Sequence, residues 1–110
     1  MKSQTIMIAL GGNSLSKKNG AGSIGEQFSK TREALEYLSE FIEKKYNICI
    51  NHGNGPQVGN ELLRMDLTYK NIPPLPLGLC VANTQGSIGY MIQQSLQNKL
   101  RKMQIDREVV

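Results

Sequence analysis

The sequence predicts an α/β protein with a mainly parallel sheet, because strand-like and helix-like segments alternate along its 110 residues. Two short apolar runs, 5–10 and 46–50, each end at or just before glycines. Continuous apolar runs of this length are typical of parallel strands that are buried on both faces. The length and the 39% apolar content allow one domain with a modest core.

Three helices are predicted, over about 26–45, 56–69 and 79–103, because apolar residues recur there at three- and four-residue steps. Pro56 suits the first turn of the second helix. The residues predicted to face inward are Phe28, Thr31, Leu35, Leu38 and Ile42 in the first helix, Val58, Leu62 and Met65 in the second, and Ile88, Met91 or Ile92, Leu96 and Leu100 in the third. A further strand is predicted to begin at 108–110, so we expect the chain to stop inside its fold.

The net charge of +4 is compatible with nucleic-acid binding, but its distribution argues against this function. The 13 basic residues are scattered, with one cluster at Lys99, Arg101, Lys102 and Arg107. Cations near the C-terminal end of a helix are favoured by the helix dipole alone. Because no aromatic side chains interleave with this cluster, it lacks a stacking platform for bases. We therefore expect a solvated helix end and no nucleic-acid partner.

The two cysteines and the length of the apolar runs indicate the cellular compartment of the protein. Cys49 and Cys80 lie in apolar stretches without metal-like or redox-like spacing, which favours free thiols in a reducing compartment. The apolar run 6–10 is too short to span a membrane or to act as a secretory signal. A cytoplasmic protein without a membrane partner is expected.

Two glycine loops carry the functional signal, Leu10-Gly11-Gly12-Asn13 and His52-Gly53-Asn54-Gly55-Pro56-Gln57-Val58-Gly59. Each follows a predicted strand, and ligands of open α/β sheets bind at the carboxyl ends of strands. Glycines let backbone N–H groups approach a phosphate, and a helix N-terminus adds favourable partial charge. Two such loops on neighbouring strands would form one phosphate cradle, with Asn13 and Asn54 contacting the ligand. A single loop of this kind could equally be a tight turn.

The spacing of the glycines argues against two common classes of phosphate site, the P-loop and the dinucleotide-binding loop. No window fits the P-loop pattern, and the glycines of the second loop do not have dinucleotide-binding spacing. The string Gly20-Ala21-Gly22-Ser23-Ile24-Gly25 matches the dinucleotide pattern, but it lies far from the strand that ends at Leu10. It lacks the tight strand–turn–helix geometry, so we interpret it as a loop.

These motifs together resemble carbamate kinase, a family of the amino-acid kinase superfamily. The resemblance rests on residues 8–13, on Glu26-Gln27, on the second glycine loop, and on Pro76-Leu77 followed by 84–91. It runs from about residue 5 to residue 110 and corresponds to the N-terminal portion of the family. It implies the N-terminal part of a three-layer α/β/α sandwich with a mainly parallel sheet. Residues 1–110 would then be one incomplete domain, the acceptor lobe, with the nucleotide lobe absent.

The resemblance implies the interconversion of ATP and carbamate with ADP and carbamoyl phosphate. Mg²⁺ would act with the nucleotide, and the chain would form a homodimer. By position, the residues that bind phosphate or carbamate would be Gly11, Gly12, Asn13, Gly53, Asn54 and Gly55. The family's lysines and aspartate around the transferring phosphate come from later segments, so we expect weak or no activity from this chain alone. The alternatives are a non-catalytic anion-binding or dimerisation module, or another member of the superfamily.

Other polar or small residues near these motifs have structural interpretations. Carbamate is already an anionic nucleophile, so His52 is expected to shape its loop rather than act as a base. Lys17 and Lys18 lie in a long glycine-bearing loop and are expected to be solvated. Gly86 and Gly89 fall inside the third predicted helix, where glycine costs about 1 kcal/mol relative to alanine. Close packing on the first strand or on a partner subunit would explain them, and both explanations remain open.

Overall fold

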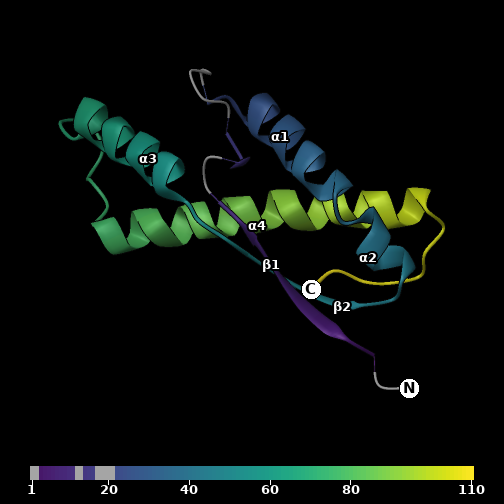
Figure 1. Ribbon diagram of the computed structural model, residues 1–110. Coiled ribbons are helices and arrows are strands. Elements are labelled where there is room, and N and C mark those ends of the chain that lie inside the picture. Colours follow the sequence, from purple (N-terminus) through teal and green to yellow (C-terminus); the bar gives the residue numbers. More distant parts are fainter. Residues whose placement is uncertain (1–2, 12–13, 17–21) are drawn as a thin grey trace.

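The computed structural model describes residues 3–11, 14–16 and 22–110. In chain order, its elements are strand β1 (Thr5–Leu10), helices α1 (Ile24–Glu36) and α2 (Ser39–Glu43), strand β2 (Asn47–His52), and helices α3 (Gly55–Thr68) and α4 (Leu77–Lys102). This alternation of strands and helices confirms the predicted α/β class (Figure 1).

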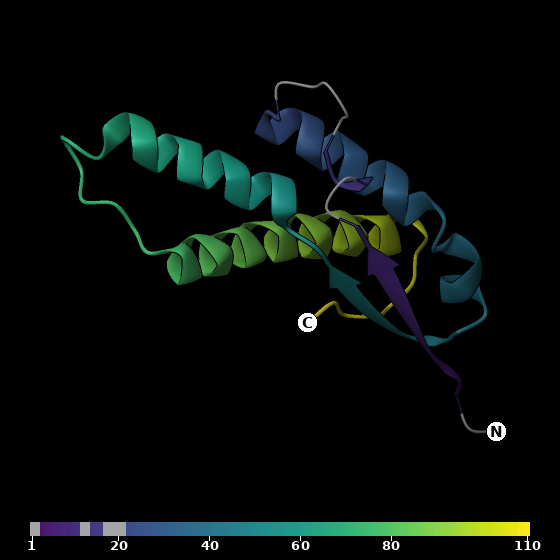
Figure 2. The same ribbon diagram turned by 60° about the vertical axis from the view of Figure 1, so that its left-hand side comes forward.

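The two strands form a parallel pair, in register from Thr5 opposite Asn47 to Leu10 opposite His52. Ile8, Ile48 and Ile50 pack against the core that α1, α2 and α4 complete. The opposite face is open, and Met7 on it is 69% exposed. The prediction that strand 5–10 is buried on both faces is therefore wrong, because the described helices cover one side of the sheet (Figure 2).

The core confirms most of the predicted inward residues. In α4, Ile88, Met91, Ile92, Leu96 and Leu100 are all buried, so both candidates at 91 and 92 face inward. In the first predicted helix, Thr31, Leu35, Leu38 and Ile42 are buried and Phe28 is half-buried. The two apolar stripes meet where α1 packs on α4.

The predicted helix 26–45 is two helices, which is a correction. α1 ends at Glu36 and α2 begins at Ser39. The Ser39 hydroxyl donates to the Glu36 carbonyl at 3.0 Å, and the Leu38 N–H donates to the Leu35 carbonyl at 3.1 Å. These shorter-range bonds satisfy carbonyls at the end of α1 and replace the regular helical ladder there.

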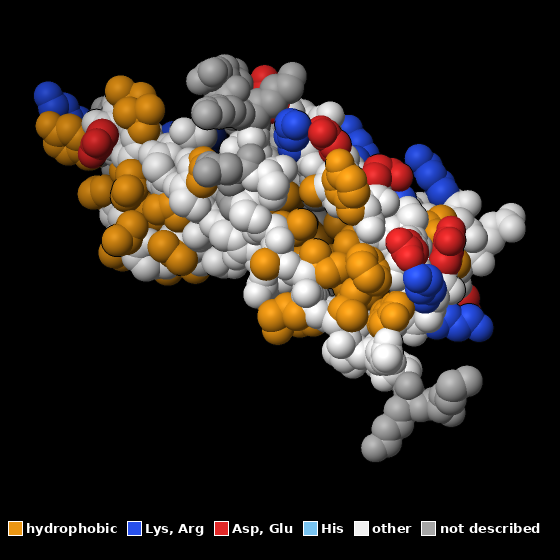
Figure 3. All heavy atoms as spheres, viewed as in Figure 1, with side chains coloured by type: hydrophobic (Ala, Val, Ile, Leu, Met, Phe, Trp, Pro, Cys, Tyr) orange, Lys and Arg blue, Asp and Glu red, His pale blue; other side chains and the backbone are white. Residues whose placement is uncertain are grey.

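The second predicted helix exists as α3, but its predicted inward face is partly wrong. Val58 and Met65 are half-buried, whereas Leu62 is 41% exposed and the polar Gln57 is the buried residue. α3 and α4 form a hairpin that extends away from the sheet (Figures 1 and 2). Because α3 packs on α4 alone along most of its length, apolar side chains gather on its outer surface (Figure 3). They include Leu62, Leu63 and Leu67.

The predicted strand at 108–110 does not form in the structure. Its backbone bonds to glutamine side chains of α4 instead of to a strand. Gln93 Nε2 donates to the Val109 carbonyl at 2.8 Å, and Gln97 Oε1 accepts from the Val109 N–H at 3.0 Å. Two side-chain amides thus hold this segment along the helix.

Gly86 and Gly89, near the middle of α4, lie in open space. A Cβ built on Gly86 or on Gly89 would meet no atom within 4 Å outside its own stretch of helix. Close packing on the first strand, one of the two explanations for these glycines, is therefore excluded within the described chain. Among the helices in the described part of the chain, none has both the length and the hydropathy that a membrane span requires.

Candidate phosphate-binding site

The structure brings the two glycine loops together at their bases. Leu10 and His52, the last residues of β1 and β2, are register partners. The Gly53 N–H donates to the Leu10 carbonyl at 3.0 Å, which continues the ladder one step beyond the strands. Gly11 and Gly53 therefore leave the sheet side by side. Gly12, Asn13, Lys17 and Lys18 lie outside the described residues.

The first loop is held by a compact turn and one buried side chain. The Gly11 carbonyl accepts from both the backbone N–H of Ser14, at 2.9 Å, and its hydroxyl, at 2.6 Å. Leu15 follows and is completely buried in the core. Sequence reasoning missed this anchor because a single leucine between serines has no periodic pattern. Its apolar character within a polar loop was the available signal.

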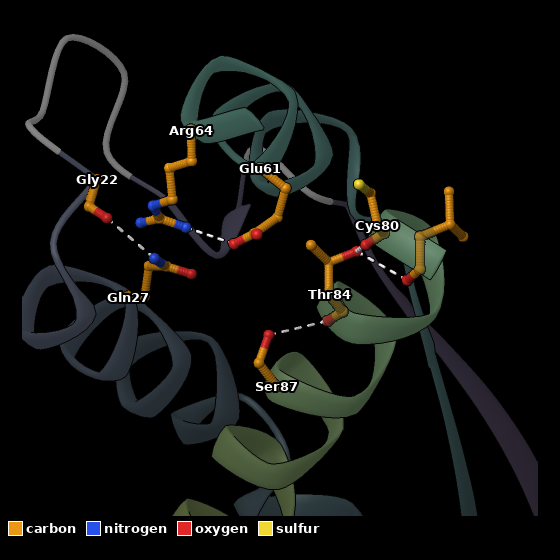
Figure 4. Close-up of polar contacts among 8 residues, drawn as sticks. Gly22, Gln27, Glu61, Arg64, Cys80, Thr84 and Ser87 are labelled. Atoms are coloured by element: carbon orange, nitrogen blue, oxygen red, sulfur yellow. Dashed lines mark hydrogen bonds and ion pairs between the residues drawn. The ribbon is translucent and has the colours of Figure 1, made fainter. Parts of the chain in front are cut away.

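The second loop is tied to α4 by Asn54, the residue before α3. Its side chain does not cap the helix. Asn54 Nδ2 instead donates to Thr84 Oγ1 at 2.9 Å and lies 3.5 Å from the Val81 carbonyl. Thr84 is 3% exposed, and its hydroxyl lies 3.1 Å from the Cys80 carbonyl and 2.9 Å from the Val81 carbonyl (Figure 4). The nitrogen of the Asn54 side-chain amide thus makes its hydrogen bonds to residues of α4.

Replacing Thr84 by valine is expected to lower the free energy of unfolding by about 1–3 kcal/mol. Valine keeps the shape of threonine but leaves Asn54 Nδ2 facing a methyl group. Urea denaturation measures the change. The matched control is Ser87→Ala, because the Ser87 hydroxyl is exposed and donates only within its own helix, to the Thr84 carbonyl. If Thr84→Val cost no more than this control, the bond between Asn54 and Thr84 would contribute nothing to stability.

The start of α3 offers free backbone donors beside the loops. The first N–H groups of any helix have no intrahelical partner, and Pro56 has no N–H, so Gly55 and Gln57 supply the donors of this first turn. A Cβ on Gly11 or on Gly55 would meet nothing within 4 Å. The backbone is therefore accessible at both loops, as an anion bound by N–H groups and by the positive end of a helix requires.

Gln57 is the feature of this site that sequence reasoning missed. Its side chain is only 7% exposed, and neither Nε2 nor Oε1 has a hydrogen-bond partner among the described residues. The available signal was its place directly after the Gly-Asn-Gly-Pro string. Most buried polar groups in proteins are paired, so this amide is an exception that needs an explanation.

The start of α1 borders the same region. A Cβ on Gly22, whose φ is +69°, would lie 3.1 Å from Asn60 Nδ2 of α3. The Gly22 carbonyl accepts from Gln27 Nε2 at 3.0 Å. Figure 4 shows this contact across from the ion pair of Glu61 and Arg64 on α3 and from Thr84 on α4. Polar groups at the start of α1 and on α4 therefore lie near the inward side of α3, which carries polar groups of its own.

His52 has a contact that fits a loop-shaping role. Its Nδ1 lies 3.1 Å from the Gly53 carbonyl, where the Nδ1–H tautomer donates. No group of three His, Cys, Asp or Glu residues in the part of the chain that the structure describes could hold a metal ion.

The fold is that of an α/β protein with two glycine loops joined at the carboxyl edge of a parallel pair of strands. The chain is homologous to carbamate kinases and matches their N-terminal portion. It is 44% identical over 109 residues to the carbamate kinase of Pyrococcus horikoshii, with 97% of this chain and 35% of that protein covered. It is also 42% identical to the carbamate kinase-like protein YahI of Escherichia coli, with 90% of this chain and 32% of that protein covered.

Solved structures agree with this relationship. A structure of Giardia carbamate kinase superposes on this chain with a TM-score of 0.91 and 30% sequence identity. The match covers all of this chain and 38% of the Giardia chain. The Giardia lamblia enzyme bound to AMP-PNP superposes with a TM-score of 0.89. No protein-family model matches the chain. The fold is thus the N-terminal α/β part of the amino-acid kinase fold, as predicted, and the chain spans about a third of the length of these relatives.

Proposed function

We propose that this chain supplies the part of a carbamate kinase that binds carbamate and the transferred phosphate. The reaction is the interconversion of ATP and carbamate with ADP and carbamoyl phosphate. The observation that carries the proposal is the joining of the two glycine loops by the hydrogen bond between Gly53 and Leu10. Named carbamate kinases at 41–45% identity support the choice of substrate.

The proposed roles divide between the two loops. We assign binding of phosphate or carbamate to Gly11, Gly12 and Asn13 of the first loop, and Gly55 of the second loop offers its N–H. Gly53 joins the loops, because its own N–H is committed to Leu10. Asn54 binds the ligand through its oxygen, since its nitrogen is committed to α4. A phosphoryl group gains from such donors because its charge spreads over its oxygens during transfer.

Mg²⁺ and the nucleotide complete the proposed reaction. Mg²⁺ prefers oxygen ligands and commonly binds through substrate phosphates with only one or two carboxylates. The residues around the two loops fit a phosphate rather than a bare cation, so Mg²⁺ would arrive with ATP or ADP. When bound, it would supply charge neutralisation of the transferred phosphoryl group. The two loops orient that group and carbamate relative to each other.

We also propose a homodimer in the cytoplasm. Gly86 and Gly89 have open space where a side chain would be, so a partner subunit could approach the backbone of α4 there. The Cys49 and Cys80 thiols are free, which fits a reducing compartment. Sedimentation of the purified chain tests the dimer.

A non-catalytic anion-binding or dimerisation module derived from the kinase is the second candidate. An assay of ATP formation from carbamoyl phosphate and ADP, run on this chain joined to the later segments of a carbamate kinase, separates the two candidates. Turnover supports the kinase, whereas phosphate binding without turnover supports the module. Phosphorylation of an amino-acid carboxylate in place of carbamate would indicate another member of the superfamily.

Replacing Gly55 by alanine is expected to weaken the binding of phosphonoacetamide, a stable analogue of carbamoyl phosphate, by about tenfold or more. The new methyl group would fill the space in front of the proposed donors. Because that space is open in the free chain, the free energy of unfolding should change by less than about 1 kcal/mol. NMR titration measures the affinity.

Gly59→Ala is the matched control for this prediction. Gly59 lies in the same helix, and its Cβ would also meet nothing within 4 Å. This control should keep the affinity of the unchanged protein. Equal affinities of both variants and the unchanged protein would exclude Gly55 from the site.

A further inference from the structure

The side-chain amide of Gln57 is buried without a partner. Gln57 is 7% exposed, and within the described part of the chain neither its Nε2 nor its Oε1 makes a hydrogen bond. Leaving a buried donor or acceptor unpaired is costly, and here one side chain carries both. A ligand that pairs with this amide would recover that cost on binding.

Gln57 lies at the start of α3, beside the second glycine loop of the proposed site. It is the third residue of α3, after Gly55 and Pro56. Side chains of a helix tilt toward its N-terminus and cover the turn before their own Cα. By this rule, the Gln57 side chain is directed back toward the turn of Gly53, Asn54 and Gly55. The same turn is fixed from the other side by the bond between Asn54 and Thr84.

We propose that Gln57 recognises the carbamoyl amide of the substrate and thereby sets specificity for a carbamoyl over an acetyl group. The inference rests on the proposed function. A carbamoyl group presents N–H and C=O side by side, and the glutamine amide presents the complementary pair. Gln57 Oε1 accepts from the carbamoyl N–H, and Nε2 donates to the carbonyl oxygen. An acetyl group has a methyl in place of the amino group and leaves Oε1 unpaired.

A structural role is the competing explanation. A glutamine at this helix position can return to the backbone N–H of the N-cap residue, as in a capping box. In the structure Gln57 makes no such bond. A capping role would affect stability and leave ligand preference unchanged, so the two roles are separable.

The test compares two analogues with the full chain and its variants. Phosphonoacetamide carries the carbamoyl-type amide, and acetonylphosphonate carries a methyl group in its place. The unchanged protein is expected to bind phosphonoacetamide about tenfold or more tightly than acetonylphosphonate. Gln57→Met, of similar length and without the amide, should reduce that preference to about twofold, because phosphonoacetamide loses both bonds to the amide and acetonylphosphonate loses only the one to its carbonyl. Gln94→Met, at an exposed position of α4, is the matched control and should keep the full preference.

Each outcome decides the question. Full preference in Gln57→Met, with or without a loss of stability, overturns the inference. Equal binding of both analogues by the unchanged protein overturns it and leaves the phosphate site standing. If neither analogue binds, the proposed function fails and the inference with it. Gln57→Leu, which removes both the donor and the acceptor, provides a second variant if the methionine variant does not fold, and it too should lose the preference.

Discussion

Replacing Leu15 by alanine is expected to lower the free energy of unfolding by about 3 kcal/mol. Leu15 is 0% exposed and belongs to the main apolar core, although it lies in the connection between β1 and α1. The substitution removes buried methyl groups and leaves a cavity at the base of the first glycine loop. Phosphonoacetamide affinity should fall as well, because Leu15 follows directly on the Gly11–Ser14 turn. Urea denaturation and NMR titration measure the two effects.

Leu63→Ala is the matched control for Leu15→Ala. Leu63 is 56% exposed on α3, so this change should alter the free energy of unfolding by no more than about 0.5 kcal/mol. Similar losses of stability in the two variants would show that Leu15 is not an anchor of the loop. A loss of stability at Leu15 without a loss of affinity would separate the anchor from the binding site.

Replacing Ile88 by alanine is expected to destabilise the protein by about 3–4 kcal/mol. Ile88 is 0% exposed, at the middle of α4, in the same core as Leu15 and Leu35. The change creates a cavity where α4 supports the other elements. Thermal and urea unfolding measure the loss.

Leu79→Ala provides the control for Ile88→Ala on the same helix. Leu79 is 50% exposed near the start of α4, so the same removal of methyl groups should cost no more than about 0.5 kcal/mol there. Comparable losses at positions 79 and 88 would contradict a core centred on Ile88.

Much of the fold could be predicted from the sequence, because its helices and strands have clear local patterns. The bounds of β1 agree with prediction, and the buried stripe of α4 agrees at every position. Both patterns depend on periodic apolar residues, which the sequence displays directly. The two strands are neighbours, as the two-loop hypothesis requires, but β2 runs from Asn47 to His52 and thus extends two residues beyond the predicted 46–50.

The remaining features depend on tertiary contacts that a local pattern cannot display. The break after Glu36 involves the hydroxyl of Ser39, which donates to the Glu36 carbonyl. The apolar stripe continues from α1 into α2, so the sequence pattern does not show the break. Leu62 is exposed because of the direction in which the α3–α4 hairpin extends, which periodicity does not encode. Gln57 is polar, so a search for apolar stripes passes over it even though it is the buried residue of α3.

The hydrogen bond from Gly53 to Leu10 has a consequence for the thermodynamics of binding. It holds the bases of the two loops at a fixed separation in the free protein. A flexible pair of loops would lose conformational entropy on closing around a ligand, and that loss would subtract from the affinity. Loops that are already joined avoid much of this loss. Rigidity at the end of the sheet thus favours tight capture of a small anion that has few atoms with which to make contacts.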